Sequence, residues 1–339
     1  MGAVPGRAEV RAELGTLLIP PYEVVFALFR FLLIIARPGL LSRLKKRALQ
    51  RASMLSSVLR TFKSAGKRVF RRSTGERSIR AAYLRHYGRS PNIQCPLTFS
   101  EKVLSRMIAL ERASDRSLTP LVDKLLVRNY VRERVGSEHL IDLLWHGTDP
   151  RAIPFDSLPE SYVIKTNHGS GGHVFVRGQP DRARVVDRFR AALRDNYYWR
   201  SREFQYFHIV PHVLVEELID DGVAFGPLDY RCWCFHGQVR LIQVDNHAHS
   251  QQDFYDQEWN PQELRHRSEG TEATSTAKPA NLSELIEVAQ ALARGFDFVR
   301  VDLYNARQHV YFGELTFTPR AGLFTFHPEA WDAKLGSWW

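Results

Sequence analysis

The sequence predicts an α+β protein with a basic helical arm at its N-terminus. Segments with the 3.6-residue apolar period of helices alternate with strand-like segments. Three pairs of the strand-like segments are separated by short polar or glycine-containing stretches, which is typical of antiparallel hairpins. The 339 residues are 44% apolar and 25% charged, a globular composition, and the length allows two or three subdomains.

The arm accounts for the net charge of the chain, which is +10 at pH 7. Residues 37–89 contain 16 Lys or Arg and a single acid, whereas residues 90–339 have a net charge of −5. The apolar segment before them, Val24–Ala36, has 13 residues and includes Arg30, whereas a membrane-spanning helix needs roughly 20 apolar residues. No clear cleavage site follows, so a signal peptide is not predicted either.

An apolar helix followed by lysines and arginines suits a membrane surface, where anionic lipid attracts each nearby basic residue by about 1 kcal/mol. We therefore predict that residues 22–72 bind an anionic membrane and that the protein is cytoplasmic, peripheral to the inner face of that membrane. The alternative is a core helix followed by a solvated linker. Nucleic acid binding is not expected, because the arm has few aromatic residues for base stacking.

The body of the chain starts near residue 81, and its helices have recognisable ends. The first opens with a capping box formed by Thr98 and Glu101, and the last has Asn281 as its cap with Glu284 as the capping-box partner. Predicted helices cover 98–113, 119–136, 181–196 and 281–295. Predicted strands cover 161–178 with an internal loop, 212–219, 229–245 with a turn at 236–237, 296–304 and 310–317.

A lysine and a glycine-rich loop stand together in VIKTNHGSGGHVFVRG, residues 163–178. Backbone N–H groups of such a loop can approach an anion closely, and Lys165 adds a mobile positive charge, so the combination suits a polyphosphate. The chain lacks the G-x-x-x-x-G-K-[ST] string of a P-loop, and a strand follows the glycines where a dinucleotide-binding fold has a helix. A surface hairpin with a solvated lysine is the alternative.

A second polar group lies on the two strands within 298–317. With a five-residue loop, Asn305–His309, Arg300 pairs with Glu314 and Asp302 points to the same face. Asp302 and Glu314 are then diagonal neighbours about 7–8 Å apart, and both can reach one metal ion. Such a pair suits Mg²⁺, which takes one or two acids with phosphate oxygens. Solvated salt bridges are the alternative, and a one-residue shift in register would move Glu314 to the other face.

Two further groups of residues are interpreted as structural. The three cysteines, Cys95, Cys232 and Cys234, form no even-numbered framework and are interpreted as small buried residues in a reducing compartment. The aromatic run 197–199 is interpreted as buried core, with stacking on a sugar as the alternative.

Eight segments, in order along the chain, resemble the TupA-like branch of the ATP-grasp superfamily, which is associated with teichuronopeptide and other surface-polysaccharide biosynthesis. They are TFSEK, DKLLVRNYV, YVIKTNHGSGG, REFQY, VLVEELI, DYRCWCFHGQ, GFDFVRVDLYN and YFGELTFTP. The resemblance implies the ATP-grasp fold, in which two α+β subdomains clasp ATP. Its predicted divisions are the arm 1–80, a helical region 81–158, a small subdomain 159–218 with the glycine-rich loop, and a large subdomain 219–335 with the metal-binding strands.

The resemblance also implies roles for individual residues. The catalytic residues would be Lys165 and Arg300, and the ligands of Mg²⁺ would be Asp302, Glu314 and Thr316, where many ATP-grasp enzymes have asparagine in place of the threonine. The ATP-binding residues would be Lys124, Lys165, His168, Gly169, Ser170, Gly171, Gly172, Glu216, Glu217, Leu218, Asp221 and Arg231.

The activity implied by the resemblance is ATP-dependent ligation. ATP would phosphorylate a carboxylate to an acylphosphate, and an amine would displace the phosphate to form an amide. The partners would be ATP, a carboxylate-bearing sugar or glycan, and an amine; a carboxylate docked at the loop 320–322 would favour this reaction. The alternatives are an ATP-dependent sugar or glycan kinase and a polysaccharide glycosyltransferase.

Overall fold

The computed structural model describes residues 75–219, 227–245, 252–266 and 276–339. The description below concerns the second unit of the chain, residues 70–339. The predicted membrane-binding segment, 22–72, lies outside the described residues. Within the described ranges, no helix is both long enough and apolar enough to cross a membrane.

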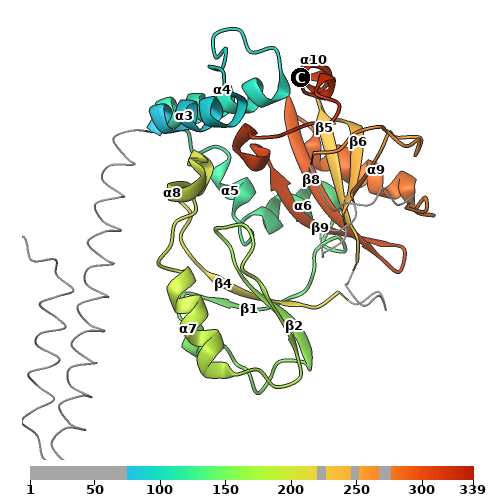
Figure 1. The fold of residues 1–339 in the computed structure, drawn as a ribbon. Coiled ribbons are helices and arrows are strands. Elements are labelled where there is room, and N and C mark those ends of the chain that lie inside the picture. Colours follow the sequence, from blue (N-terminus) through green and yellow to red (C-terminus); the bar gives the residue numbers. More distant parts are fainter. Residues whose placement is uncertain (1–74, 220–226, 246–251, 267–275) are drawn as a thin grey trace, which may run out of the picture. The chain divides into compact units, whose positions relative to one another are not determined.

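Two antiparallel sheets form the framework of the second unit (Figure 1). The small sheet has the order β1-β4-β2-β3, and the large sheet has the order β7-β6-β5-β8-β9. The small sheet consists of β1 (Leu143–Gly147), β2 (Ser161–Thr166), β3 (Val174–Arg177) and β4 (Val213–Glu217). The large sheet consists of β5 (Asp229–Phe235), β6 (Gln238–Asp245), β7 (Gln252–Tyr255), β8 (Phe298–Ala306) and β9 (His309–Thr316).

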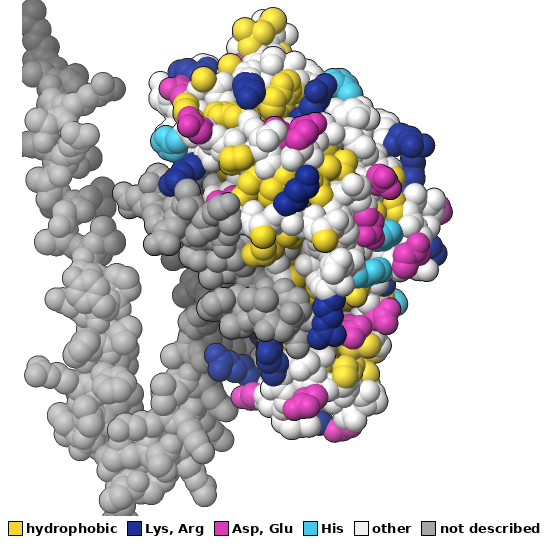
Figure 2. Space-filling view, turned by 90° about the vertical axis from the view of Figure 1, so that its right-hand side faces the viewer, with side chains coloured by type: hydrophobic (Ala, Val, Ile, Leu, Met, Phe, Trp, Pro, Cys, Tyr) yellow, Lys and Arg dark blue, Asp and Glu magenta, His cyan; other side chains and the backbone are white. Residues whose placement is uncertain are grey.

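Helices and short 3₁₀ turns connect and cover the sheets. The helices are α3 (Gly75–Tyr87), α4 (Phe99–Ala113), α5 (Thr119–Val122), α6 (Val127–Val135), α7 (Arg182–Ala192), α8 (Tyr198–Ser201), α9 (Leu282–Ala293) and α10 (Ala330–Trp338). The 3₁₀ turns are η2 (Pro150–Ala152), η3 (Phe204–Tyr206) and η4 (Pro319–Gly322). On the face of the molecule seen in Figure 2, basic and acidic side chains are interspersed.

The small sheet has one buried and one polar face because its strands alternate. Ile164 and Val215 point to the face that packs on α7 and belong to one apolar cluster with Phe189 of that helix. Val163 lies opposite both Phe175 and Glu216, so these side chains share the other face with Lys165. That second face therefore carries the predicted phosphate-binding lysine.

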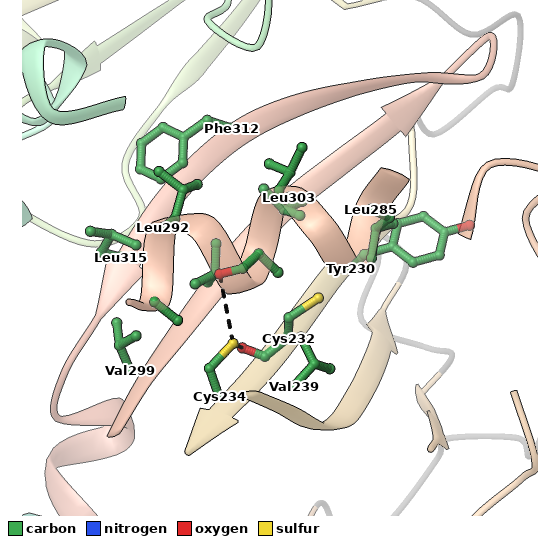
Figure 3. Close-up of a cluster of buried hydrophobic side chains, with 14 of the residues drawn as sticks. Tyr230, Cys232, Cys234, Val239, Leu285, Leu292, Val299, Leu303, Phe312 and Leu315 are labelled. Atoms are coloured by element: carbon green, nitrogen blue, oxygen red, sulfur yellow. Dashed lines mark hydrogen bonds between the residues drawn. The ribbon is translucent and has the colours of Figure 1, made fainter. Parts of the chain in front are cut away.

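The large sheet is also divided by face. Its apolar face packs on α9, in a cluster that includes Cys232, Cys234, Val299, Leu303 and Leu315 (Figure 3). On the opposite face, Trp233, Phe235 and Phe298 pack with Phe99 and other side chains of α4 at one end. The remainder of that face carries the charged residues of β5, β8 and β9, so the core leaves room for a polar site there.

Several predicted helices are confirmed with their caps. Thr98 accepts a hydrogen bond from Glu101 N and forms the predicted capping box of α4, and Asp181 caps α7. The cap of α9 differs from the prediction. Asn281 makes no side-chain cap bond, because its Oδ1 accepts instead from Asn305 Nδ2 at 2.7 Å, while its Nδ2 donates to Glu284 Oε2. Cys232 and Cys234 are buried as predicted, but Cys95 is exposed on a loop.

The single helix predicted over 119–136 is wrong, because the chain breaks between α5 and α6. Asp123 has an extended ψ of 112°, and its Oδ1 accepts hydrogen bonds from Leu125 N and from Asn167 Nδ2. Lys124 N in turn donates to Asn167 O. The side chain of Asp123 thus competes with the helical hydrogen bonds, and Lys124 lies in the break instead of on a solvated helix face.

The predicted register of the β8–β9 hairpin is also wrong: Phe312, predicted opposite Asp302, lies opposite Leu303 on the apolar face, although Arg300, Asp302 and Glu314 share a face as predicted. The turn is the two-residue Arg307–Gln308, both with positive φ, so Tyr304 faces Tyr311 and not Val310. A second displacement occurs at Gly313, an extra residue between the pairs Leu303–Phe312 and Asp302–Glu314. Together the two displacements move the pairing by two residues. Because side chains alternate between the faces of a strand, Glu314 remains on the same face of the sheet as Asp302.

Candidate active site

The two predicted metal acids lie directly opposite each other on β8 and β9. Asp302 pairs in register with Glu314, which is closer than the diagonal arrangement expected from the sequence. Arg300 Nε donates to Asp302 Oδ1 at 2.7 Å and Arg300 Nη2 donates to Asp302 Oδ2 at 2.6 Å. Thr316 Oγ1 donates to Glu314 Oε1 at 3.2 Å. The strands thus bring all four predicted residues into one cluster.

The two carboxyl groups have opposite pKa shifts. Burial raises the pKa of Asp302 to about 6, although the charge of Arg300 acts in the other direction. Burial also acts to raise the pKa of Glu314, but the positive charges of Lys124 and Arg300 outweigh it and lower this pKa to about 2. At neutral pH both groups are therefore predominantly ionised, as ligands for a cation must be.

Lys124 connects the acids with the glycine-rich loop. Its Nζ lies 3.0 Å from Glu314 Oε2 and donates to Gly169 O at 3.1 Å. The side chain reaches both because the break after α5 releases it from a helix surface; only 15% of it is exposed. One lysine therefore contacts both halves of the site predicted from the sequence.

Lys165 forms the second ion pair of the site, on the polar face of the small sheet. Its Nζ lies 2.5 Å from Glu216 Oε2, and Arg128 lies 3.7 Å from the other oxygen of the same carboxylate. Glu216 is 5% exposed in its side chain and comes from β4, beside the strand of Lys165. The predicted ATP-binding residues Lys165 and Glu216 are thus joined in one buried pair.

The loop between β2 and β3 has the open backbone that the glycines suggest. Gly171 and Gly172 have φ of 73° and 79°, and no atom lies within 4 Å of where a Cβ would stand. Ser170 and both glycines are exposed. Arg188 of α7 donates to Gly172 O at 3.1 Å, which connects the far end of the loop to the helix.

The first residues of the same loop are buried and hydrogen-bonded. His168 is held through Nδ1 by Asn167 Oδ1 and through Nε2 by Asp195 O, and burial lowers the pKa of this histidine. Asn167 is fully buried, and its Nδ2 donates to Asp123 Oδ1 at 3.0 Å and to Val210 O at 2.9 Å. These residues anchor the loop and leave its glycines free to contact a ligand.

Arg231 lies behind Asp302 on the neighbouring strand β5. Its Nη1 donates to Asp245, its Nη2 donates to Asp229 Oδ2 at 3.0 Å, and its Nε lies 3.8 Å from Asp302 Oδ2. Burial opposes the charged form of Arg231, but the surrounding carboxylates raise its pKa. Arg231 therefore stays charged and places a positive charge beside the Asp302 carboxylate.

The remaining predicted ATP-binding residues are Glu217, Leu218 and Asp221. Glu217 is exposed, and its backbone N–H donates to Asp142 O at 2.9 Å. Leu218 is half-buried at the end of β4. Asp221, predicted to bind the nucleotide, lies outside the described residues.

Three residues near the site receive no role from sequence reasoning. Asn167 and Glu203 occur in segments that resemble the family, but a buried amide or carboxyl has no spacing signal. Phe175 is 51% exposed on the face of Lys165. Its exposure follows from its place on the edge strand β3, which only the sheet order reveals.

The oxygen donors of the cluster fit magnesium. Asp302, Glu314 and Thr316 supply two carboxylates and a hydroxyl, which are hard ligands. Among the described residues, no group of three or more His, Cys, Asp or Glu side chains is placed to hold a metal ion. The donor set therefore suits an ion that brings further oxygen ligands from phosphate and water, as Mg²⁺ does.

Comparison with known proteins defines the class of the chain. Residues 101–339 match the family model described as TupA-like ATPgrasp. The chain belongs to the TupA-like ATP-grasp family, which confirms the resemblance and the fold predicted from the sequence. A search of curated proteins found no match.

Solved structures similar to the chain include D-alanine–D-alanine ligases and an L-amino acid ligase. D-alanine–D-alanine ligase from Bacillus anthracis, complexed with ATP, has 16% identity and a TM-score of 0.39, with 63% of this chain and 62% of that chain covered. The Helicobacter pylori D-alanine–D-alanine ligase has 17% identity and a TM-score of 0.41, with 65% and 61% covered. L-amino acid ligase from Bacillus licheniformis has 14% identity and a TM-score of 0.38, with 65% and 49% covered. The chain thus spans less than two thirds of the length of each.

Proposed function

We propose that the protein is an ATP-dependent carboxylate–amine ligase that forms ADP and acts in the biosynthesis of a cell-surface polysaccharide or glycopeptide. Membership of the TupA-like ATP-grasp family supports the use of ATP. The observation that carries the proposal is the position of Lys124, whose Nζ contacts Glu314 and Gly169 at 3.0 and 3.1 Å. A polyphosphate at that lysine would lie between the glycine loop and the metal acids.

The charged groups of the site suit phosphoryl transfer, which depends mostly on positioning and charge neutralisation. Lys165 and Lys124 would bind phosphate oxygens, and the backbone N–H groups of Gly171 and Gly172 would cover them. Arg300 would stabilise the negative charge that develops on the transferred group. Mg²⁺, held by Asp302 and Glu314 with Thr316, would neutralise the charge of the phosphates.

The proposed reaction has two steps. A carboxylate oxygen of the first substrate attacks the γ-phosphorus, the bond to the β-phosphate oxygen breaks, and ADP leaves. The amine then attacks the acyl carbon, phosphate leaves with the bonding electrons, and the nitrogen loses a proton to give the amide. Because an acylphosphate hydrolyses readily, closing of the exposed loop around Gly171 over the site would protect it.

The carboxylate substrate is proposed to be a uronic acid of a sugar or glycan, docked near Arg320. This residue is exposed and lies in η4, directly after the strand that carries Glu314 and Thr316. A guanidinium at that position suits bidentate binding of a carboxylate. The amine is proposed to be that of an amino acid.

One set of assays separates the proposed ligase from the alternatives. Purified protein is incubated with ATP, Mg²⁺, uronates and amino acids, and phosphate release is measured with and without the amine. Amine-dependent formation of ADP and phosphate supports the ligase. ADP with a stable phosphosugar indicates a kinase, and consumption of a nucleotide sugar without ATP turnover indicates a glycosyltransferase.

Variants test the assigned residues in the same assay. Lys165→Ala and Glu314→Ala are expected to abolish turnover, while Glu160→Gln, at an exposed glutamate directly before β2 that has no role in the site, should leave it unchanged. Full activity of Glu314→Ala would remove the metal assignment. Circular dichroism and thermal unfolding of each variant show whether the fold is intact.

The arm is proposed to attach the enzyme to an anionic membrane at the inner face, where a lipid-linked glycan would be available. The proposal rests on the cluster of Lys and Arg that follows Val24–Ala36. Full-length protein should sediment with phosphatidylglycerol vesicles, less so at high salt, and a variant lacking residues 1–60 should not. Equal sedimentation of the two proteins would contradict the proposal.

A further inference from the structure

A buried carboxyl group lies beside the site without being part of the proposed metal or nucleotide contacts. Glu203, between α8 and η3, is 5% exposed, and its Oε1 accepts a hydrogen bond of 2.6 Å from Thr318 Oγ1. Gln205 Nε2 donates to the same hydroxyl, also at 2.6 Å. Thr318 is fully buried and lies two residues after Thr316. The three side chains Glu203, Gln205 and Thr318 are called the Thr318 lock below.

The segment that follows Thr318 has an unfavourable backbone conformation. In η4, Arg320 has φ/ψ of 52°/23° and Ala321 has 53°/31°, and Gly322 has φ of 73°. Consecutive non-glycine residues in the left-handed region persist only where their surroundings hold them, and such segments concentrate at functional sites. This turn presents Arg320 to solvent directly beyond the strand of the metal acids.

The turn is held from both ends. On the α4 side, Tyr87 OH donates to Gly322 O at 3.1 Å, and a Cβ on Gly322 would come within 2.9 Å of Ser100 O. On the other side, the contacts of Thr318 are those of the lock, since its hydroxyl donates to Glu203 and accepts from Gln205. Without the lock, the buried hydroxyl of Thr318 would lose both side-chain hydrogen bonds that it makes at this end of the turn.

The lock also lies within electrostatic reach of the reacting groups. Burial raises the pKa of Glu203 to about 7, the hydrogen bond from Thr318 lowers it, and the charges of Glu314 and Arg300 both act on it. Burial, together with the charge of Glu203, raises the pKa of Tyr197 and of Tyr206. A change in the charge of Glu203 would therefore alter the electrostatic environment of Glu314 and Arg300.

We propose that Glu203 and Thr318 are positioning residues. They hold the turn Pro319–Gly322 so that Arg320 lies where the carboxylate substrate would bind. The lock needs a hydrogen-bond acceptor at residue 203 and a hydroxyl at residue 318; a negative charge at residue 203 is not required. This inference rests on the proposed ligase only for the identity of the reaction. The hydrogen bonds and the strained turn are independent of it.

Matched pairs of variants test the lock in the full-length protein. Thr318→Ser and Glu203→Gln keep the hydroxyl and the acceptor, whereas Thr318→Val and Glu203→Leu remove them at similar volume. Hydrogen exchange of peptides covering residues 317–324 should be at least tenfold faster in Thr318→Val and Glu203→Leu than in their partners. The dissociation constant for Mg²⁺–AMPPNP should remain within about twofold of wild type in all four variants that fold.

Turnover gives the second readout. In Thr318→Val, kcat for amine-dependent phosphate release should fall at least tenfold while KM for ATP stays the same, and Thr318→Ser should restore kcat. Equal exchange in Thr318→Val and Thr318→Ser would overturn the lock, as would loss of AMPPNP affinity equal to that of Lys165→Ala. If wild-type protein shows no ligation, the proposed function fails, and the exchange data still decide the lock.

Discussion

Asp302 lies directly opposite Glu314 because two displacements in the β8–β9 hairpin compensate each other. The two-residue turn shifts the pairing by one residue, and the bulge at Gly313 shifts it by one more. A one-residue shift alone would place Glu314 among the apolar side chains that pack on α9. The pairing of these two proposed metal ligands thus depends on Gly313, a residue that contributes no side chain.

Gly313→Ala is expected to weaken both the fold and the site. A Cβ at this position would lie 2.9 Å from Asp302 O and 3.2 Å from the Tyr304 ring, so the bulge must open or shift. We expect a loss of about 1–3 kcal/mol in the free energy of unfolding, measured by urea denaturation, and at least tenfold weaker binding of Mg²⁺–AMPPNP. Unchanged values of both would show that the bulge does not set the position of Glu314.

The basic groups of the site are already paired with its acids, and this predicts that nucleotide and metal bind together. Lys165 pairs with Glu216, and Arg300 with Asp302, so each ligand alone would have to displace a partner. Glu216→Gln should therefore strengthen binding of AMPPNP without Mg²⁺ by about three- to tenfold, measured by calorimetry, because Lys165 loses its competing anion.

Glu160→Gln is the matched control for that substitution, since Glu160 is exposed directly before β2 and has no role in the proposed site. It should bind metal-free AMPPNP as the wild type does. If Glu216→Gln binds the nucleotide no more tightly than this control, Lys165 is not restrained by Glu216 and the expectation of joint binding is wrong.

The elements of the fold follow from local patterns, whereas the exceptions depend on distant partners. Apolar periodicity and caps suffice for α4, α7 and most of the strands. The break around Lys124 could not be predicted, because it needs Asn167, 44 positions away from Asp123, to share the aspartate. Local sequence around 119–136 is compatible with a continuous helix, and the competing hydrogen bond exists only in the folded chain.

In the candidate site too, some residues follow from local sequence patterns and others depend on distant partners. Asp302 and Glu314 could be proposed from the sequence because charged residues on paired strands have a spacing that implies a shared face, and Lys165 could be proposed because it precedes a glycine-rich loop. Glu203 could not, because its partner Thr318 is 115 positions away and a buried carboxyl has no periodic signal. The predicted subdomain limits, 159–218 and 219–335, stay a prediction; β1, at Leu143–Gly147, is an additional strand of the small sheet.

Glu203 should make the stability of the protein depend on pH. Its folded pKa of about 7 lies above the usual glutamate value of 4.5, so the folded state binds the proton more tightly than the unfolded state. The folded state is therefore destabilised as pH rises through this window. Between pH 5 and pH 8, wild type should lose about 2–3 kcal/mol more free energy of unfolding than Glu203→Gln, which has no such proton.

Urea denaturation at both pH values checks this difference. The glutamine variant keeps the acceptor for Thr318 Oγ1, so its fold should be retained at both. A wild-type stability that changes with pH in parallel with Glu203→Gln would contradict the raised pKa of Glu203.

Asn167→Asp should disrupt the junction between the glycine loop and Lys124. Asn167 Nδ2 donates to Asp123 Oδ1 at 3.0 Å inside the core. A second carboxylate there would replace the donor by a like charge and leave Asp123 partly unpaired. We expect a loss of at least about 2–3 kcal/mol in the free energy of unfolding at pH 7, smaller at pH 4, where a buried carboxyl would take up a proton.

Asn129→Asp gives the control for this substitution. Asn129 is exposed on α6, where its Oδ1 accepts from Arg132, and a carboxylate can accept the same hydrogen bond. The control should unfold within about 0.5 kcal/mol of wild type and bind Mg²⁺–AMPPNP normally. Because Lys124 N donates to Asn167 O and Lys124 Nζ contacts Glu314, Asn167→Asp should also weaken nucleotide binding by more than tenfold. Wild-type affinity in a destabilised Asn167→Asp protein would mean that Lys124 is placed by α5 and α6 alone.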